Sequence, residues 1–270
     1  MIDMTLRPSA CAFDAIAHVF DDRFGAWASV ASQRRAVRST LLQVFPPQGQ
    51  VLEVGGGTGE DAMFLAQRGF RVFLTDASPC MVDVARRKLS PLGSCAQVIA
   101  GEEIERFAEE RREAGEPQLD GAFSNFAPLN CVQDIRSVAR GLASLLKPGA
   151  VAALVLFGTC CPAEMLVETV RGRPRNALRR FKHGAVRARL AKQNFDVFYH
   201  RSADLRRAFQ PWFSLERKIG IGVAVPPSAA EPWISCHPRL LANLEAFDRV
   251  MARPLALLGD HVLYQFRRKT

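Results

Sequence analysis

A glycine-rich segment is the part of the chain whose residue types and spacing point most directly to chemistry. Glycines stand at positions 55, 56, 57 and 59, directly after the apolar run of residues 51–54. A strand that leads into glycines and then into a helix lets a ligand approach the backbone closely at a helix N-terminus. The dinucleotide pattern G-x-G-x-x-G would need glycine at position 60, where the chain has Glu60. The segment therefore predicts a ligand site of another kind.

Acidic side chains flank this loop. Glu53 precedes the first glycine by two residues; its carboxylate would repel a pyrophosphate but suits a ligand that carries an ammonium group and a sulfonium. Asp76 ends the next apolar run, where a carboxylate can accept both hydroxyls of a ribose. Met81 could pack on an adenine face. Glu102 and Glu103 could accept the adenine amino group, and the alternative, that they serve a helix N-terminal dipole, has equal weight.

Alternating strand and helix signals surround these residues. Five short apolar runs predict strands, at residues 51–54, 71–75, 96–100, 119–124 and 150–157. Between them, helical patterns cover residues 59–68, 78–89, the Glu-rich stretch up to about 113, and 134–146. Ser78 before Pro79 is a plausible N-cap. This alternation predicts an α/β fold, a parallel sheet with helices on both faces.

The alternation of strands and helices is absent on both sides of this region. Residues 10–24 and 33–45 each place apolar side chains on one helical face. After Gly158 the chain reads as helical and basic up to about residue 200, where another strand would be due. Strands are expected again at 213–219 and 262–267, with a helix at 239–251. Because no repeat or low-complexity linker is present, we expect one domain with an insertion.

Several of these segments together resemble the class I S-adenosylmethionine (SAM)-dependent methyltransferases, of the small-molecule type. The segments that carry the resemblance are residues 51–59, 74–76, 119–126 and 145–149, with residues 13–17 and 20–21 resembling a helix that covers the cofactor. The resemblance is dense over about 10–157. It implies a Rossmann-like, seven-stranded, mostly parallel sheet with an antiparallel last strand at 262–267. It also implies a single domain, 1–270, with an N-terminal helical lid (about 1–47) and a basic cap insertion (about 158–200).

By that resemblance the chain is an enzyme that transfers a methyl group from the cofactor SAM to a small-molecule acceptor. The cofactor-binding residues then expected are Glu53, Gly55, Gly57, Thr58, Asp76, Ala77, Met81, Glu102, Glu103 and Asn125. Phe126 and Asn130 follow the fourth strand, where cofactor and acceptor should meet. Residues 125–128, Asn-Phe-Ala-Pro, lack the Pro-Pro-aromatic arrangement of enzymes that methylate amino groups of nucleic-acid bases. We therefore expect no DNA partner.

Methyl transfer is an in-line displacement, so a general base is needed only if the acceptor must lose a proton. Tyr199 and His200 are adjacent in a chain with two tyrosines and five histidines. We treat them as candidate catalytic residues, although such a pair is more often structural. His18 is a weaker candidate. His183, His237 and His261 are interpreted as structural or surface residues.

The net charge of +9 has a local source. Residues 171–192 hold seven arginines, two lysines and no acid, and the rest of the chain is balanced at 27 basic and 27 acidic residues. One interpretation is a solvated face whose arginines pair with the glutamates of residues 102–116. The other is a cap that binds a carboxylate or phosphate of the acceptor, with Arg179 and Arg180 as substrate-binding residues, or an anionic surface. A macromolecular or lipid acceptor, and a non-catalytic SAM-binding protein, remain alternatives.

Composition bounds the remaining classes. Hydrophobic residues at 48% and charged residues at 23% are typical of a soluble globular protein, and no apolar run reaches the length of a membrane helix. Residues 1–12 lack the order of a signal peptide, so a cytoplasmic location is expected. The seven cysteines form no C-x-x-C pair. We expect reduced thiols and no metal, although Cys160 and Cys161 could bind a soft metal. The oligomeric state is left open.

Overall fold

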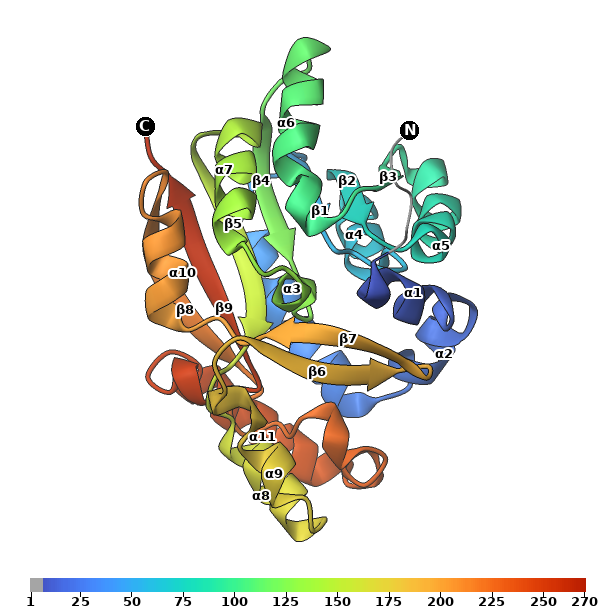
Figure 1. The fold of residues 1–270 in the computed structure, drawn as a ribbon, viewed down its shortest axis with the longest axis vertical. Coiled ribbons are helices and arrows are strands. Elements are labelled where there is room, and N and C mark those ends of the chain that lie inside the picture. The colour runs from blue at the N-terminus through green and yellow to red at the C-terminus, as the bar shows by residue number, and fades with distance from the viewer. Residues whose placement is uncertain (1–6) are drawn as a thin grey trace.

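A seven-stranded sheet runs through the computed structural model, which describes residues 7–270 (Figure 1). The strand order is β3-β2-β1-β4-β5-β9-β8. The strands are β1 (Gln50–Val54), β2 (Arg71–Asp76), β3 (Cys95–Val98), β4 (Leu119–Ser124), β5 (Leu146–Phe157), β8 (Phe213–Ile221) and β9 (His261–Arg268). Neighbours among β1 to β5 pair in parallel, and β9 pairs antiparallel with both β5 and β8. The expected sheet, with its antiparallel last strand, is confirmed.

Helices cover both faces of the sheet, and each face has its own apolar core. Helices α3 (Ala28–Val44), α4 (Glu60–Ala66) and α5 (Pro79–Leu89) contribute to one core. Helices α6 (Ile104–Glu113), α7 (Ile135–Leu145) and α10 (Ser202–Phe209) contribute to the other. As predicted, α5 starts after Ser78, whose hydroxyl accepts the backbone N–H of Met81. The expected lid, residues 1–47, included α3. Because α3 packs in a core layer of the sheet, only the chain before α3 is in a position to serve as a lid.

The first predicted helix, residues 10–24, is broken into three pieces. They are α1 (Pro8–Asp14), a 3-10 turn (Ala17–Val19) and α2 (Phe20–Gly25). Ile16 and Val19 leave the helical conformation, and branching at their Cβ atoms weakens the helix at these positions. The two bends keep the apolar side of the segment against Met81 of α5. The segment formed by α1 and α2 is called the lid below.

The insertion after β5 is helical only in its first part. Helices α8 (Pro162–Val170) and α9 (Pro174–Ala177) are followed by a hairpin of β6 (Ala185–Leu190) and β7 (Gln193–Phe198). The expectation of helix up to residue 200 was wrong, because the residues there alternate with a period of two. Val186, Ala188 and Leu190 are partly covered, whereas Arg187 and Arg189 are exposed.

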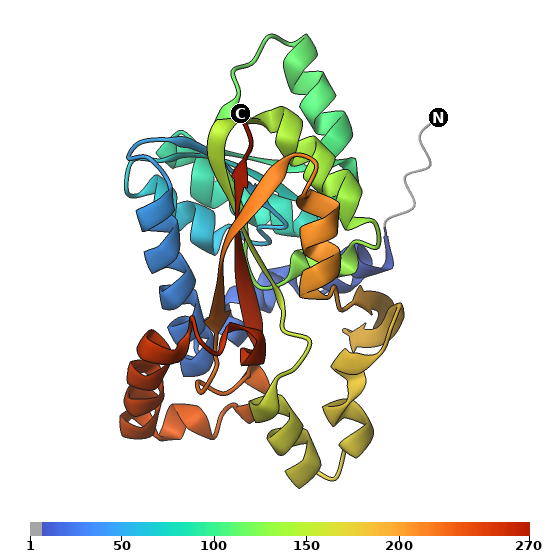
Figure 2. The same cartoon turned by 90° about the vertical axis from the view of Figure 1, so that its left-hand side faces the viewer.

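The hairpin lies across the carboxyl ends of the central strands and beside the lid (Figure 1). Its covered side packs against Ala12 and Phe13 of α1 through Phe195 and Val197. Helix α11 (Pro238–Met251) lies beyond this end of the sheet, away from the hairpin (Figure 2). Within residues 7–270 no helix is both long and apolar enough to cross a membrane.

Candidate active site

The glycine loop and Asp76 are joined by hydrogen bonds at the carboxyl ends of β1 and β2. Parallel pairing of the two strands places Val54 beside Thr75. The Gly57 N–H donates to Asp76 Oδ2 at 2.8 Å, and the Ser78 N–H donates to Asp76 Oδ1 at 2.9 Å. Burial raises the pKa of Asp76, and these backbone donors oppose that shift. Each oxygen keeps a lone pair, so the oriented carboxylate can still accept ribose hydroxyls.

The loop is packed tightly on one side and open on the other. Gly55 and Gly57 have positive φ angles of 70° and 55°, a conformation in which glycine is favoured. A Cβ on Gly55 would lie 2.3 Å from Cβ of Pro128, whereas a Cβ on Gly57 would meet nothing within 4 Å. The open side of the loop at Gly57 therefore leaves room for a ligand close to the backbone.

Glu53 is a buried carboxylate with an unused oxygen. The residue is 2% exposed, and its Oε2 atom has no hydrogen-bond partner in the described structure. Burial, and next the charge of Asp61, raise the pKa of Glu53 well above its ordinary value, although Arg34 opposes the shift. A buried oxygen without a donor is costly in free energy. The site therefore fits a ligand that brings N–H donors or positive charge to this oxygen.

Two acids fasten the lid, one to the glycine loop and one to the start of α5. Asp21 accepts the Thr58 hydroxyl at 2.6 Å and also pairs with Lys88 at 2.6 Å. Asp14 accepts the backbone N–H of Cys80 at 3.0 Å and, in addition, the hydroxyl of Ser78. The expected cofactor residue Thr58 thus lies on the loop, but its hydroxyl is engaged by the lid. Met81 is 1% exposed and covered by lid residues, so it lies under the lid as well.

The remaining expected cofactor residues are occupied by the protein itself. Glu103 accepts the Ala100 N–H at 2.9 Å, as expected if it serves the N-terminus of a helix. Glu102 pairs with Arg7 at 3.2 Å. Asn125 donates to Asp61 at 2.8 Å and accepts the N–H of the next residue at 2.8 Å. Glu102, Glu103 and Asn125 therefore already have partners within the protein, and their role in binding the cofactor stays a prediction. Ala77 follows Asp76 directly and stays a prediction.

Four rings gather at the carboxyl ends of β4 and β5, and we call them the aromatic floor: Phe126, Phe157, Tyr199 and His261. The Phe157 ring stacks on His261 at 4.9 Å between centroids, and Phe126 meets His261 edge-on at 5.8 Å. Tyr199 lies 5.9 Å from Phe157. Phe126, Phe157 and Tyr199 are each only partly covered. Arg34 lies over the Phe126 ring and Arg180 over the Phe157 ring, at 5.0 and 5.1 Å, so only the uncovered parts of these rings are left for an acceptor.

Two expected site residues instead tie the hairpin to the sheet. Asn130 is 1% exposed; it donates to the Phe198 carbonyl at 2.6 Å and accepts the Phe157 N–H at 3.0 Å. His200 Nε2 lies 2.9 Å from the Val132 carbonyl, and burial lowers the pKa of this imidazole. Because both ends of its amide contact the protein, Asn130 has a structural role here, and its expected contact with substrate stays a prediction. The same reasoning favours a structural role for His200, while Tyr199 stays a prediction.

Arg180 is buried and fully engaged. Its Nη2 lies 2.6 Å from Asp260 Oδ1, its Nη1 donates to the Asp260 carbonyl at 2.6 Å, and its Nε pairs with Glu164. Arg179 also pairs with Glu164. Arg180 is thus turned to groups of the protein, whereas Arg179, whose side chain is 44% exposed, stays a prediction as a substrate-binding residue. The glutamates of residues 102–116 are not partners of these two arginines, since ion pairs there join Arg7, Arg106, Arg111 and Arg140.

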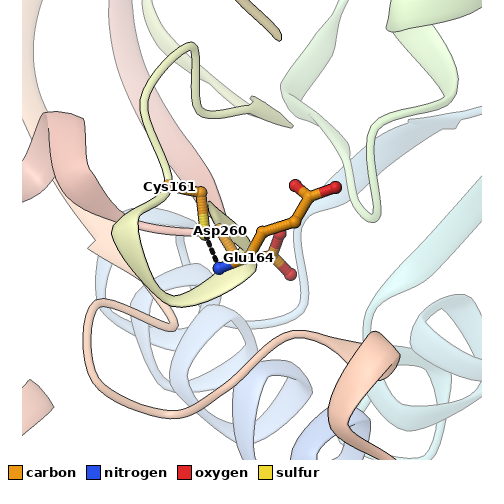
Figure 3. A group of neighbouring side chains, drawn as sticks. All are labelled: Cys161, Glu164 and Asp260. Carbon is orange, nitrogen blue, oxygen red and sulfur yellow. Dashed lines mark hydrogen bonds between the residues drawn. The ribbon is translucent and has the colours of Figure 1, made fainter. Parts of the chain in front are cut away.

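Cys161, Glu164 and Asp260 form a buried group at the base of the cap (Figure 3). Their potential ligand atoms lie within 4.8 Å of one another. However, the Arg180 guanidinium bridges the two carboxylates and supplies the positive charge that a metal would bring. Burial raises the pKa of the Cys161 thiol to about 12, and its sulfur accepts the Glu164 N–H. The group is therefore better described as an ion-pair network than as a metal centre.

Sequence reasoning missed the charged residues beneath the loop and the pair at the start of β9. Asp61 is 4% exposed and pairs with Arg34 and Arg38 at 3.7 and 2.6 Å. Asp260 and His261 are 4% and 6% exposed, and His261 is part of the aromatic floor. A signal for the second pair existed: an antiparallel strand beside β5 must begin at the carboxyl ends of the parallel strands, so its first residues reach the site.

The sequence is similar to known proteins over part of its length. Residues 51–149 match the family model described as a methyltransferase domain. Over 117 residues the chain is 32% identical to the tRNA 5-carboxymethoxyuridine methyltransferase of Escherichia coli (strain K12). This match covers 43% of this chain and 43% of that protein. Over 146 residues it is 29% identical to the biotin biosynthesis bifunctional protein BioHC of Cellvibrio japonicus (strain Ueda107), 53% of this chain and 27% of that protein. The chain thus spans less than half the length of these curated relatives.

Solved structures match over nearly the whole chain. The CcbJ methyltransferase from Streptomyces caelestis has a TM-score of 0.61 at 16% identity, covering 96% of this chain and 98% of that one. A SAM-dependent methyltransferase from Mesorhizobium loti has a TM-score of 0.55 at 17% identity, covering 88% and 98%. The expected class I methyltransferase fold is confirmed. Residues 51–149 also match a methyltransferase domain, as expected for this part of the chain.

Proposed function

We propose that the chain as a whole is a SAM-dependent methyltransferase acting on a small-molecule acceptor, with lid, sheet and cap working as one domain. The observation that carries the proposal is the unpartnered Oε2 of Glu53, buried at the end of β1 beside the glycine loop. A catalytically inert fold would gain stability by replacing such a group. Its presence is accounted for by a ligand with a positively charged nitrogen.

The residues at the ends of β1 and β2 fit SAM. Glu53 would take the ammonium group, and Asp76, already oriented by two backbone donors, would take the ribose hydroxyls. The loop is open at Gly57 for close approach. When bound, SAM supplies an electrophilic methyl group. This chain's own task is then to hold the acceptor in line and to exclude water.

The lid and the hairpin are placed to perform that task. Asp14 and Asp21 fasten the lid over the loop, and Phe195 and Val197 of β7 pack against α1. The acceptor would lie between this cover and the partly exposed rings of the aromatic floor. Since Arg179 and Arg180 are neutralised by Glu164 and Asp260, a carboxylate or phosphate on the acceptor is not part of the proposal.

Calorimetric titration with SAM tests the cofactor half of this proposal. We expect the wild-type protein to bind SAM, and Glu53→Gln to weaken binding at least tenfold, because the amide adds N–H donors opposite an ammonium. Glu110→Gln is the matched control, since Glu110 pairs with Arg106 on the exposed side of α6. If wild type failed to bind at millimolar SAM, or if Glu53→Gln bound as tightly as wild type, the proposal would be lost.

A nucleoside within RNA is a second candidate acceptor. Two observations favour it: Arg187, Arg189 and Lys192 are exposed on the hairpin, and a relative is by name a tRNA methyltransferase. Polyanions bind such clusters of basic residues in a salt-dependent way. Incubation with labelled SAM and either total tRNA or a low-mass metabolite fraction distinguishes the two. We expect label in the low-mass fraction, and label in tRNA instead would replace the small-molecule assignment.

A further inference from the structure

We infer that His261, held by Asp260, takes a proton from the acceptor, and that the acceptor is a planar aromatic compound carrying a hydroxyl group. This inference rests on the proposed methyltransferase function and adds to it a catalytic residue and a substrate class. Its basis is the position of one histidine at the meeting point of three elements: β9, the end of β5 and the loop after β4.

The direction of β9 places His261 at the site. Because β9 is antiparallel to β5, its first residue pairs with the last residue of β5, Phe157. The imidazole is 6% exposed, stacks on Phe157 and meets Phe126 edge-on. Phe126 itself follows β4, at the point where an acceptor should meet the cofactor. His261 is therefore part of the aromatic floor, whereas the imidazole of His200 is turned to the Val132 carbonyl.

Asp260 is fixed in a position to orient the imidazole. One of its oxygens lies 2.6 Å from Arg180 Nη2, and the other accepts from Gln33 Nε2 at 3.3 Å. The second oxygen also lies 3.3 Å from His261 Nδ1. Although burial favours the neutral acid, His261 and Arg180 hold the pKa of Asp260 below its ordinary range. An ionised carboxylate beside Nδ1 favours the tautomer with hydrogen on Nδ1, which leaves a lone pair on Nε2.

The contact between Nδ1 and Asp260 is close but not aligned as a hydrogen bond. Such contacts are often loose in ligand-free enzymes and tighten in the complex. Within the described residues, no hydrogen bond engages Nε2 of His261. Several charged or titratable groups surround the imidazole. They are Asp260 directly before β9, Cys161 directly before α8, Glu164 on α8, Arg180, Arg34 on α3, and Tyr199.

These surroundings define the acceptor. The uncovered parts of the phenyl rings favour a planar aromatic molecule, which can meet them edge-on. The acceptor oxygen would form a bond to the methyl carbon while the carbon–sulfur bond breaks and its electron pair stays on sulfur. The hydroxyl proton passes to His261 Nε2 and later to water. A carboxylate acceptor is already deprotonated and would need no such base.

Transfer assays with two matched sets of acceptors test the inference. Tritiated SAM is supplied with phenol, catechol and hydroxyquinoline, or with benzoate and quinoline carboxylate. We expect transfer to the hydroxylated set, and a loss of turnover of about 10²–10⁴-fold in His261→Gln with unchanged SAM affinity. His237→Gln, an exposed histidine bound to the Trp233 carbonyl, serves as control and should keep wild-type turnover. Wild-type turnover in His261→Gln would overturn the role of His261.

The state of the imidazole gives a readout independent of turnover. Nitrogen-15 NMR of the ligand-free protein should show His261 with hydrogen on Nδ1, and a shift of that equilibrium in Asp260→Asn, whose folding is checked by its melting temperature. Hydrogen on Nε2 in wild type would overturn the proposed dyad. If SAM binds but only the carboxylates, or none of the compounds, are methylated, this inference fails and the cofactor assignment stands. If SAM does not bind, the proposed function fails first.

Discussion

Glu53 and Asp260 are two buried carboxylates, one beside the glycine loop and one where the cap joins the sheet. The protein satisfies the second carboxylate but not the first. They are 2% and 4% exposed. Asp260 is bound by Arg180 and Gln33, and its pKa is lowered, whereas Glu53 keeps an unpartnered oxygen and its pKa is raised. A buried charge satisfied by the protein supports its structure, and one left unsatisfied costs stability until a ligand meets it.

Removing the cation at the cap junction should have the largest effect on stability. Arg180→Met leaves Glu164 and Asp260 buried without their shared partner, so we expect a loss of about 3–5 kcal/mol in the free energy of unfolding. Denaturant titration measures it. Arg175→Met, at an exposed site in the same basic stretch, is the control and should stay within about 0.5 kcal/mol. A small effect of Arg180→Met would mean that the junction is not held by this network.

Around Glu53, the largest loss of stability should come from a substitution in the glycine loop. Gly55→Ala adds a Cβ 2.3 Å from Pro128 at a φ of 70°, so we expect a loss of about 3 kcal/mol and impaired SAM binding. Gly93→Ala has nearly the same φ, 69°, but meets nothing within 4 Å. It should cost only about 1–2 kcal/mol. Equal losses in thermal unfolding would show that φ alone, and not close packing, requires glycine at position 55.

Neutralising Glu53 should stabilise the ligand-free protein. Because the pKa of Glu53 is raised on folding, the unfolded state releases its proton first as the pH rises past about 4.3, and stability is lost from there up to the raised pKa. Glu53→Gln removes this loss. We expect its melting temperature to exceed that of wild type at pH 7 by a few degrees, and to match wild type near pH 4. A lower melting temperature at pH 7 would contradict the unsatisfied state of Glu53.

Asp260 should show the reverse dependence. Its pKa is depressed in the folded protein, so its stabilising contribution is present above the unfolded-state value of about 3.9 and is lost as the pH falls through the folded-state value. Asp260→Asn should therefore lower the melting temperature at pH 7, and the difference from wild type should shrink towards pH 2. A difference that does not change with pH would indicate that packing, and not charge, accounts for the loss.

The smallest effect is expected on the outer side of the hairpin. Arg189 is exposed opposite Asn194, so Arg189→Ala should change the free energy of unfolding by no more than about 0.5 kcal/mol and leave SAM affinity unchanged. The informative measurement on this variant is its binding of RNA. A weaker and less salt-dependent binding of total tRNA in the variant would favour the second candidate acceptor.

The two regions also differ in how far the sequence predicts them. Glycines 55–59, Asp76 and Ser78 act through local backbone geometry, so their spacing predicted the loop, the end of β2 and the start of α5. Arg180 depends on Asp260, eighty positions further along the chain, and no local pattern relates them. For the same reason Asn130 and His200, which hold the hairpin, resembled site residues in the sequence. The hairpin itself has a period-two pattern that was hidden by its basic composition.

The place of β9 between β5 and β8 has a consequence for synthesis of the protein. One edge of β5 is completed only by residues 261–268, and until these leave the ribosome a long apolar strand is left with unpaired backbone groups on that side. Such an edge invites pairing with other chains. A helper protein that shields β5 during translation would therefore matter more for the yield of this protein than for its final stability.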